Sequence, residues 1–486
     1  MSIVAGVDSS TQSTKVVLRD ADDGTVLGIG RAPHPATFPP LSEQHPDAWW
    51  QAFVAAFFAA VADSGRQARD VKAISVAAQC HGLVALDSTD RVLRPAKLWN
   101  DTTTAPQMER LRERMPADEW ANRIGSVPTA AFTVSKLVWL RENEPDRYAR
   151  VGRVLLPHDW LTLKLTGNAV TDRSDASGTG YFDSVSNEYD PVILSLVDGE
   201  RDLLPLLPAV LDPAEPAGRV RSQVCAELGI SDDVIVGPGA GDQHASALGL
   251  GIEPGELVYS LGTSGVVYTV SGLRPADAAG IVDGVADADG GFLPLVSTLN
   301  AAKVADTVGR LLGVDHDELG ALALNAPLDD DRPVFSAFLD GERKPDRPSA
   351  RGTLSGLTTA TTREQLALAA FEGIVFGLLR GQRALEAAGI DCSGDLLAVG
   401  GAAQSPAARQ VLADATGREV LTTSVPEPVA SGATVQAAAV LRGVSVSEAR
   451  AAWAPTRAAV ARPRVSLSAE VFARYTTLAD WSGLDE

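Results

Sequence analysis

Short apolar runs that end at glycine or polar residues recur along the chain and alternate with segments of helical periodicity. Such runs are predicted as strands at residues 3–7, 15–18, 71–78, 155–156, 234–236, 257–259 and 396–399. Helical patterns cover residues 365–387 and 406–415, and Ser405 and Gly417 stand where the second of these helices would begin and end. This alternation of strands and helices predicts an α/β fold.

A further helix is predicted to begin near Pro46. Its apolar residues follow spacings of three and four and give a wide buried face, at positions 50, 53, 54, 57, 58 and 61. The longest apolar run of the chain, residues 52–62, lies in this segment and is too short to span a bilayer. We therefore expect a core helix here and no membrane contact.

Two segments about half a chain apart share one pattern. Residues 3–20 and residues 256–271 each consist of an apolar strand, a turn rich in Gly, Ser and Thr, and a second apolar strand. The similarity predicts two related domains, at residues 1–245 and 246–486, although hairpins with Ser/Gly turns are also common in unrelated proteins. The boundary is expected close after Asp242, near residues 249–255, whereas the Pro-rich residues 343–348 are typical of a loop.

The composition limits the partners that the chain can have. Its 486 residues exceed one ordinary core, and 45% hydrophobic and 21% charged residues are typical of a globular protein. The net charge of −20 argues against nucleic acid and against an anionic membrane surface as partners. Cys80, Cys225 and Cys392 are too few and too far apart for a disulfide framework or a zinc site. Because no signal peptide is recognised either, a cytoplasmic enzyme is expected.

Several common motifs for nucleotides and metals are absent from the sequence. It contains no Gly-Lys dipeptide, which rules out a P-loop, and it contains no HRD, DFG or HExxH motif. A chain of this kind that handles phosphates must hold them on another scaffold.

Two hydroxyl-rich turns are candidates for that scaffold. The first spans residues 9–15 and follows Asp8, whose carboxylate at a strand end could hold Mg²⁺ directly or through water. Its hydroxyls and amides could contact phosphate oxygens, while Lys15 neutralises charge. The second turn, GTSG at residues 262–265, could approach the same phosphates from the other domain. Taken alone, each turn is more typical of an ordinary hairpin.

Further candidates follow two other predicted strands. Gly400 and Gly401 come after the strand at 396–399, and their bare backbone could lie against a nucleotide base or ribose. Cys80 and His81 end the strand at 71–78, and such strand ends often face a ligand. A lone histidine is, however, more often structural, and Cys80 has no visible activating partner.

The stretch GPGAGDQHASALG, residues 237–249, surrounds one carboxylate, Asp242, with four glycines. Glycine lets backbone approach another group closely or adopt positive φ. A carboxylate in such a place is either a turn former or a reactive group held against a ligand.

These motifs occur in the order found in FGGY carbohydrate kinases, and the chain resembles that family from Ile3 to about Arg442. The segments that carry the resemblance are AGVDSSTQSTK, SEQHPDAWW, AAQCHG, LWND, LLPHDWLTLKLTG, TDRSDASGTGYFD, GAGDQHASALG, YSLGTSG and VGGAAQSPAARQVLAD. Each is weakly specific alone, but nine in this order and spacing are strongly specific. The resemblance implies the actin-like ATPase fold: two RNase H-like domains around a central cleft, with ATP mostly on the C-terminal domain and the sugar mostly on the N-terminal one.

The resemblance also implies a role for each candidate residue. Asp242 would be the catalytic base, and Asp8 and Asp242 would lie near Mg²⁺. ATP would contact Thr11, Gln12, Ser13, Lys15, Gly262, Thr263 and Ser264 with its phosphates, and Gly400, Gly401 and Gln404 with its adenosine. The sugar would contact Cys80, His81, Trp99, Asp101, Asp242 and Gln243.

The reaction expected from the resemblance is the ATP-dependent phosphorylation of D-xylulose. Other acceptors such as D-ribulose, D-arabinitol or glycerol stay open, because Ala78, Cys80 and Thr103 stand where the family usually has Gly, Met and Arg. The adenosine motif, GGAAQS, also lacks a third Gly and a Lys that are common there. An actin- or Hsp70-like ATPase that drives a partner is the alternative from another class. Since the family is often dimeric, a homodimer is left open as well.

Overall fold

The computed structural model describes residues 2–485, which divide into two compact units. Unit 1 runs to Ile252 and also contains Gly284–Leu293 and Val425–Pro455. Unit 2 contains Glu253–Asp283, Pro294–Ser424 and the residues from Thr456 onwards. The first crossing therefore lies in the expected region near residues 249–255, but a single division between residues 245 and 246 does not describe the chain, because two later segments return to unit 1.

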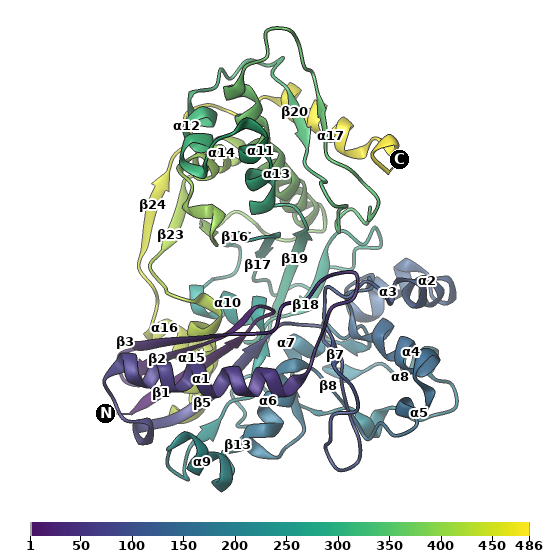
Figure 1. Ribbon diagram of the computed structural model, residues 1–486, viewed down its shortest axis with the longest axis vertical. Coiled ribbons are helices and arrows are strands. Elements are labelled where there is room, and N and C mark those ends of the chain that lie inside the picture. Colours follow the sequence, from purple (N-terminus) through teal and green to yellow (C-terminus); the bar gives the residue numbers. More distant parts are fainter. Residues whose placement is uncertain (1, 486) are drawn as a thin grey trace. The chain divides into compact units, whose positions relative to one another are not determined.

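A mixed sheet forms the centre of unit 1 (Figure 1). Its strands lie in the order β13 (Gly218–Arg219), β14 (Ile235–Val236), β5 (Val71–Ala78), β1 (Ile3–Ser9), β2 (Ser13–Asp20) and β3 (Val26–Pro33), with β15 (Ala240–Gly241) also paired to β5. The strands β1, β2 and β3 are antiparallel in sequence, whereas β5 runs parallel to β1, and β14 and β15 run parallel to β5. The buried apolar positions of β1 and β2 explain why the predicted first hairpin stands at the middle of this sheet.

Unit 2 is built on a second mixed sheet (Figure 1). Its order is β18 (Asp283–Ala286), β19 (Phe292–Thr298), β17 (Gly265–Thr269), β16 (Leu257–Leu261), β22 (Leu396–Val399), β23 (Val420–Thr423) and β24 (Arg457–Ala461). Most of β18 and the first two residues of β19 fall in Gly284–Leu293, the segment counted with unit 1. The strand β16 is antiparallel to β17 and parallel to β22, as β1 is antiparallel to β2 and parallel to β5 in unit 1. The repeated arrangement confirms the two related hairpins and agrees with a pair of RNase H-like domains.

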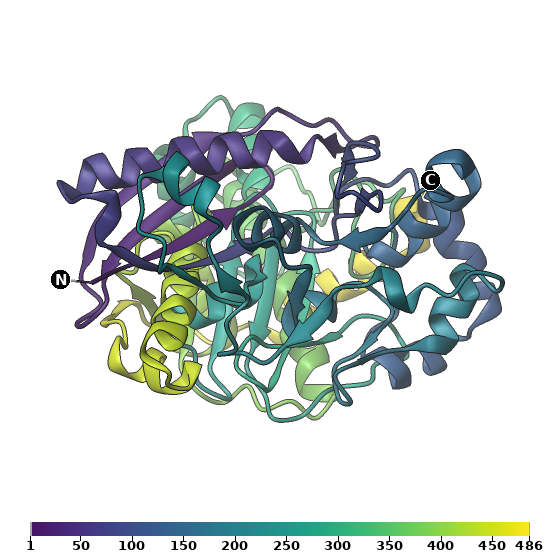
Figure 2. The same cartoon turned by 90° about the horizontal axis from the view of Figure 1, so that it is seen from below.

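Helices cover both faces of the unit 1 sheet (Figure 2). The predicted helix from Pro46 is α1 (Pro46–Ser64), which packs on β3 and β2, while α15 (Pro428–Arg442) packs on β1 and β5. A Cβ atom at Gly6 in β1 would lie 2.0 Å from the carbonyl oxygen of Ala430 in α15. Such close backbone contact explains why residues 425–455 belong to unit 1 although they follow most of unit 2 in sequence.

Further elements of unit 1 surround its sheet. The helices are α2 (Ala105–Arg114), α3 (Ala117–Ile124), α4 (Thr133–Asn143), α5 (Pro145–Tyr148), α6 (Pro157–Thr166), α7 (Arg173–Ala176), α8 (Pro191–Val197), α9 (Ser222–Leu228), α10 (Asp242–Leu250) and α16 (Val446–Ala452). Short strand pairs join β4 (Glu43–Gln44) to β7 (Ala96–Lys97), β6 (Val84–Leu86) to β8 (Arg153–Leu155), β9 (Val170–Asp172) to β12 (Ala209–Leu211), and β10 (Phe182–Asp183) to β11 (Glu188–Tyr189).

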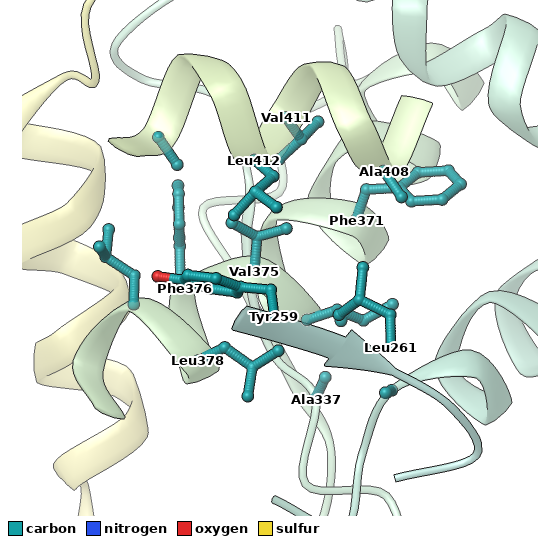
Figure 3. Packing of buried hydrophobic residues seen from close by; sticks show 14 of the residues in the cluster. Tyr259, Leu261, Ala337, Phe371, Val375, Phe376, Leu378, Ala408, Val411 and Leu412 are labelled. Carbon is teal, nitrogen blue, oxygen red and sulfur yellow. The ribbon is translucent and has the colours of Figure 1, made fainter. Parts of the chain in front are cut away.

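The core of unit 2 lies between its sheet and two helices (Figure 3). The helices are α13 (Arg363–Ala387) and α14 (Pro406–Thr416), and their apolar side chains meet Tyr259 and Leu261 of β16. Ser405 caps α14 by accepting a hydrogen bond from the amide of Ala408 at 3.5 Å, and Gly417 ends the helix at φ 67°, as predicted. The rest of the unit includes α11 (Ala302–Leu312), α12 (His316–Asn325), β20 (Val334–Ser336), β21 (Thr353–Ser355) and α17 (Ala469–Asp480).

Within residues 2–485, no single helix is both long enough and apolar enough to cross a membrane. The pair α15 and α16 meets the length and composition criteria only when the two are taken together, and they are bent by 115° at their junction.

Candidate active site

The carboxyl ends of three strands bring the unit 1 candidates together. Because β1, β5 and β15 are parallel, the residues that follow them emerge at the same edge of the sheet. Ser9 at the end of β1 and Gly241 at the end of β15 both pair with Ala78, the last residue of β5. Asp8, the pair Cys80 and His81, and Asp242 therefore meet at one edge, although they lie far apart in the sequence.

Asp242 is the first residue of α10, and Gly241 precedes it as the N-cap. Its Oδ1 accepts a hydrogen bond from the amide of Gln243 at 2.8 Å and one from Cys80 Sγ at 3.5 Å. Burial raises the pKa of Asp242 to about 6, and the nearby charge of Asp8 contributes in the same direction. The free amides of a helix N-terminus favour the ionised form at this position, whereas burial favours the protonated form. Asp242 can therefore exist as a carboxylate near neutral pH and still take up a proton.

The glycines before Asp242 make room for side chains of the protein itself. Gly239 has φ 92°, and a Cβ atom there would lie 2.4 Å from Nδ1 of His158. A Cβ atom at Gly241 would lie 2.5 Å from Cys80 Sγ and 2.5 Å from His244 Nδ1. Any larger residue at these positions would displace the segment that leads into Asp242, which explains why glycines precede this residue.

Asp8 belongs to a chain of charged contacts that reaches a distant part of the sequence. Its carboxylate is 1% exposed, accepts a hydrogen bond from Ser10 Oγ at 2.5 Å, and lies 3.4 Å from Lys15 Nζ. Lys15 Nζ also lies 2.8 Å from Oε2 of Glu427, the residue that precedes α15. Burial raises the pKa of Asp8 although Lys15 opposes the shift, and burial opposes the rise that both carboxylates cause in the pKa of Lys15.

The pair Asp8 and Asp242 has the chemistry of a magnesium site. Both carboxylates have a raised pKa because they are withdrawn from water, and in each case repulsion from another acidic side chain raises the pKa further: Glu427 acts on Asp8, and Asp8 acts on Asp242. A divalent cation held by these carboxylates would relieve both costs. Among residues 2–485 no group of three or more His, Cys, Asp or Glu could hold a metal, but Mg²⁺ commonly takes one or two carboxylates together with phosphates and water.

Thr11 links the first turn to the sugar-side candidates. Its hydroxyl accepts a hydrogen bond from Trp99 Nε1 at 2.9 Å and donates one to Gln79 Oε1 at 3.1 Å. The side chain of Thr11 thus joins the turn to Trp99 and to the end of β5. Two other residues of this turn are expected to contact the phosphates of ATP. Gln12 is exposed in the turn, and Ser13 is buried at the start of β2.

Asp101 is fully buried and engaged by protein groups on both oxygens. Its Oδ2 accepts from the amide of Ser42 at 2.9 Å and from Lys97 Nζ at 3.2 Å, and its Oδ1 accepts from Thr103 Oγ1 at 2.5 Å. Lys97 and Asp101 are both 0% exposed. This geometry favours a role in fixing the loop of Trp99 over the sugar contact that the sequence predicts for Asp101.

Position 103 carries threonine where the family usually has arginine, but a lysine from a neighbouring strand lies beside it. Lys97 Nζ donates a hydrogen bond to Thr103 Oγ1 at 2.9 Å and lies 4.1 Å from the ring centre of Trp139. A lysine in β7 therefore stands beside Asp101 although position 103 itself carries no charge.

His81 is held in an unusual backbone conformation. Its φ is 66°, a region that costs a non-glycine residue roughly 1–3 kcal/mol and is common at functional sites. The ring lies against Phe132, with 4.7 Å between ring centres, and Nδ1 lies 2.5 Å from the carbonyl oxygen of Gly178. Thr133 Oγ1 donates to the backbone carbonyl of His81 at 3.1 Å. These contacts fix the imidazole at the end of β5, next to Cys80.

The nucleotide candidates of unit 2 also gather at one edge of a sheet. The turn of Gly262, Thr263 and Ser264 follows β16, while Gly400 and Gly401 follow the parallel neighbour β22. Gly400 has φ 94°, and a Cβ atom there would lie 2.6 Å from the carbonyl oxygen of Leu261 at the end of β16.

Several residues at this edge are exposed to solvent. Thr263, Gly400, Gly401 and Gln404 are exposed. Gln404 Oε1 accepts a hydrogen bond from Arg409 Nη2 at 3.2 Å. Bare backbone beside a hydroxyl turn is an arrangement that can bind a nucleotide.

Sequence patterns gave no sign of several residues that complete the unit 1 site. Glu427 meets Lys15 across 412 positions of sequence, and Phe132 and Gly178 support His81 from separate loops. These residues belong to no recognisable motif, and only the folded structure shows that they lie beside residues that do.

Two family patterns cover most of the chain. The pattern of the N-terminal domain of the FGGY family of carbohydrate kinases matches residues 3–249, and that of the C-terminal domain matches residues 257–441. A protein named xylulose kinase from Streptomyces coelicolor is 43% identical over 473 residues, which cover 96% of this chain and 94% of that protein. The xylulose kinase of Escherichia coli is 34% identical over 85% of each chain.

A solved structure shows the same fold. The crystal structure of xylulose kinase from Bifidobacterium adolescentis superposes with a TM-score of 0.85 at 35% identity, covering 98% of this chain and 99% of the other. The expected actin-like ATPase fold is thereby confirmed, and a carbohydrate kinase replaces the alternative of a partner-driving ATPase. With both domain patterns present in order, this chain belongs to the FGGY family of carbohydrate kinases and takes ATP as its co-substrate.

Proposed function

We propose that this chain transfers the γ-phosphoryl group of ATP to the 5-hydroxyl of D-xylulose, with Asp242 as the catalytic base. The observation that carries the proposal is the carboxylate of Asp242 at the N-terminus of α10, beside Asp8 and the Cys80–His81 pair. Relatives named xylulose kinase, 43% and 44% identical over most of the chain, support D-xylulose as the sugar.

Asp242 accepts the proton of the attacking hydroxyl as the new phosphate ester forms. In phosphoryl transfer this proton moves late, so the base mainly orients the hydroxyl and then takes its proton. A pKa of about 6 leaves Asp242 ionised at neutral pH while keeping it a stronger base than an exposed aspartate. The hydrogen bonds from Gln243 and Cys80 to the same oxygen, Oδ1, leave Oδ2 for the sugar hydroxyl.

The phosphates require cations and donors from the chain. Lys15 offers a positive charge next to Asp8, and Asp8 and Asp242 are the residues proposed to hold Mg²⁺. When bound, Mg²⁺ neutralises charge on the phosphate oxygens. We assign further ATP contacts to the turns and glycines already described: Thr11, Gln12, Ser13, Gly262, Thr263, Ser264, Gly400, Gly401 and Gln404.

The sugar is assigned to the edge formed by β5 and its neighbours. His81, with its ring fixed by Phe132 and Gly178, presents its imidazole there, and Trp99, whose Nε1 is bonded to Thr11, presents its ring. Cys80 and Gln243 flank Asp242 and are proposed to contact the ketose as well. Asp101 contributes indirectly, because its hydrogen bonds fix the loop of Trp99.

The proposal is tested by ADP release from purified protein with Mg-ATP. The acceptors are D-xylulose, D-ribulose, L-ribulose, D-arabinitol, xylitol and glycerol, with a blank that contains no acceptor. Strong stimulation by D-xylulose above all others is expected. A clear preference for a different acceptor would keep the kinase chemistry and refute the proposed substrate.

A second candidate substrate class follows from Cys80 and Thr103. Cysteine is shorter than the methionine usual in the family, which leaves more room beside Asp242, and Thr103 is committed to Asp101 and Lys97. A different ketose or a polyol would then be preferred in the same panel.

We further expect the protein to act in the cytoplasm on small molecules, and sedimentation would decide whether it is a homodimer.

A further inference from the structure

A fully buried cluster of one histidine and three aspartates lies next to the segment that leads into Asp242. Nε2 of His158 in α6 lies 3.0 Å from Asp159 Oδ1, 3.4 Å from Asp172 Oδ1 and 3.5 Å from Asp175 Oδ2. His158, Asp159 and Asp175 are 0% exposed, and Asp172 is 2% exposed. Carboxylates are seldom buried at this density unless a cation compensates them.

The histidine is that cation. Burial alone would lower the pKa of His158, but Asp159, Asp172 and Asp175 outweigh burial and raise it to about 9. Burial raises the pKa of Asp175 well above its usual range and also raises that of Asp159, while the charge of His158 opposes both shifts. The acidic members come from the start of α6, the end of β9 and α7, so His158 ties three elements together.

The cluster is linked at two points to the segment that precedes Asp242. The His158 ring fills the space next to Gly239, where a Cβ atom would lie 2.4 Å from Nδ1. Asp172 caps α7 by accepting hydrogen bonds from the amides of Ser174 at 2.7 Å and Asp175 at 3.1 Å. Ser174 Oγ in turn accepts a hydrogen bond from the amide of Gly241 at 3.4 Å. Gly239 and Gly241 are three residues and one residue before Asp242.

We propose that His158 is a positioning residue for the catalytic base: held by three buried carboxylates, it fixes Gly239 directly and Gly241 through α7 and Ser174. Neither His158 nor the cluster touches the substrates in this account. The inference rests on the proposed role of Asp242 and does not depend on which sugar accepts the phosphoryl group.

The test compares His158→Gln, which removes the charge, with His158→Lys, which keeps a cation. Misplacing a reacting group by about 1 Å can cost roughly 100-fold, so His158→Gln is expected to lower kcat by about 10- to 100-fold while the KM for Mg-ATP changes little. His158→Lys is expected to recover most of that loss. Ser174→Ala, which removes only the acceptor for the Gly241 amide, is expected to lower kcat by several-fold, and it carries the test if His158→Gln does not fold.

Arg332→Met is the matched control, because Arg332 and Glu372 form a similarly buried ion pair in unit 2, 2.6 Å apart. It should lower the melting temperature about as much as His158→Gln and leave kcat near wild type. Full kcat in folded His158→Gln, or an equal loss in Arg332→Met with no recovery in His158→Lys, would overturn the inference. Asp242→Asn is measured in parallel with the best acceptor of the wild type: if that variant keeps its turnover, the base assignment fails and the inference fails with it, whereas a dead Asp242→Asn beside a fully active His158→Gln refutes the inference alone.

Discussion

Opposing effects meet on the carboxylate of Asp242. Burial and the charge of Asp8 favour its protonated form, whereas the amide of Gln243 and the thiol of Cys80 stabilise the ionised form. The result is a pKa of about 6, which is near the working pH and therefore suited to a base that must both be ionised and accept a proton.

The pH dependence of the reaction follows from this value. The base must be ionised to act, and its pKa is raised, so activity is expected to be present above about pH 6 and to be lost as pH falls through it. The measurement is kcat/KM from pH 5 to 8.5 with both the sugar and Mg-ATP well below their KM, which reports the free enzyme. An activity that stays level or rises down to pH 5 would contradict the assignment.

The buried pair of Lys97 and Asp101 makes a prediction about stability. Lys97→Met leaves the carboxylate of Asp101 without its cation in a fully buried position, and such uncompensated charges cost about 3–5 kcal/mol. Urea unfolding should show a loss of that size. The double variant Lys97→Met/Asp101→Asn should recover part of it, and an equal or larger loss in the double variant would show that the two side chains are not coupled.

At the scale of elements, two helices make backbone contact at glycines, and this contact helps to place the carboxylate of Asp242. A Cβ atom at Gly432 in α15 would lie 1.7 Å from the carbonyl oxygen of Ala245 in α10, and one at Gly249 in α10 would lie 2.0 Å from that of Pro428. The backbones of α10 and α15 are therefore in contact. Because α10 begins with Asp242 and α15 follows Glu427, this contact fixes two of the charged groups of the site relative to each other.

Gly432→Ala tests that contact. The added methyl group must push the helices apart, and overpacking of this kind costs about 1–3 kcal/mol. We expect lower stability together with a clear loss of kcat, measured by urea unfolding and ADP release.

The matched control is Gly377→Ala in the middle of α13, where a Cβ atom would meet only Tyr475 Oη, at 3.4 Å. Alanine favours a helix over glycine by about 1 kcal/mol, so the control should be neutral or stabilising and fully active. Unchanged kcat in a destabilised Gly432→Ala would separate the helix contact from catalysis.

On the scale of the whole molecule, much of the architecture was predictable from local patterns. The hairpins at residues 3–20 and 256–271 form central strands of the two sheets and have the same antiparallel pairing. They were predictable because alternation and turn chemistry act within a few residues. The helix from Pro46 and the caps Ser405 and Gly417 were confirmed for the same reason. The edges at which the candidate residues gather follow from parallel pairing.

Contacts between distant segments were not predictable in this way. The return of residues 425–455 to unit 1 depends on the close fit of α15 against β1 and α10, and no local pattern signals it. The sequence did not reveal that the hydroxyl of Thr11 bonds to Trp99 and Gln79, or that Asp101 is enclosed by Lys97, Ser42 and Thr103. A motif identifies a residue as part of a site, whereas its partners are set by tertiary packing.

The measurement that tests the account most directly is the turnover of Asp242→Asn with D-xylulose and Mg-ATP, together with the affinity of the same variant for D-xylulose by calorimetry. The base and its charge are lost while the shape is kept, so kcat should fall by roughly 100- to 10,000-fold and the affinity for the sugar should change only slightly. Turnover near that of the wild type would contradict the role of Asp242 and the mechanism built on it.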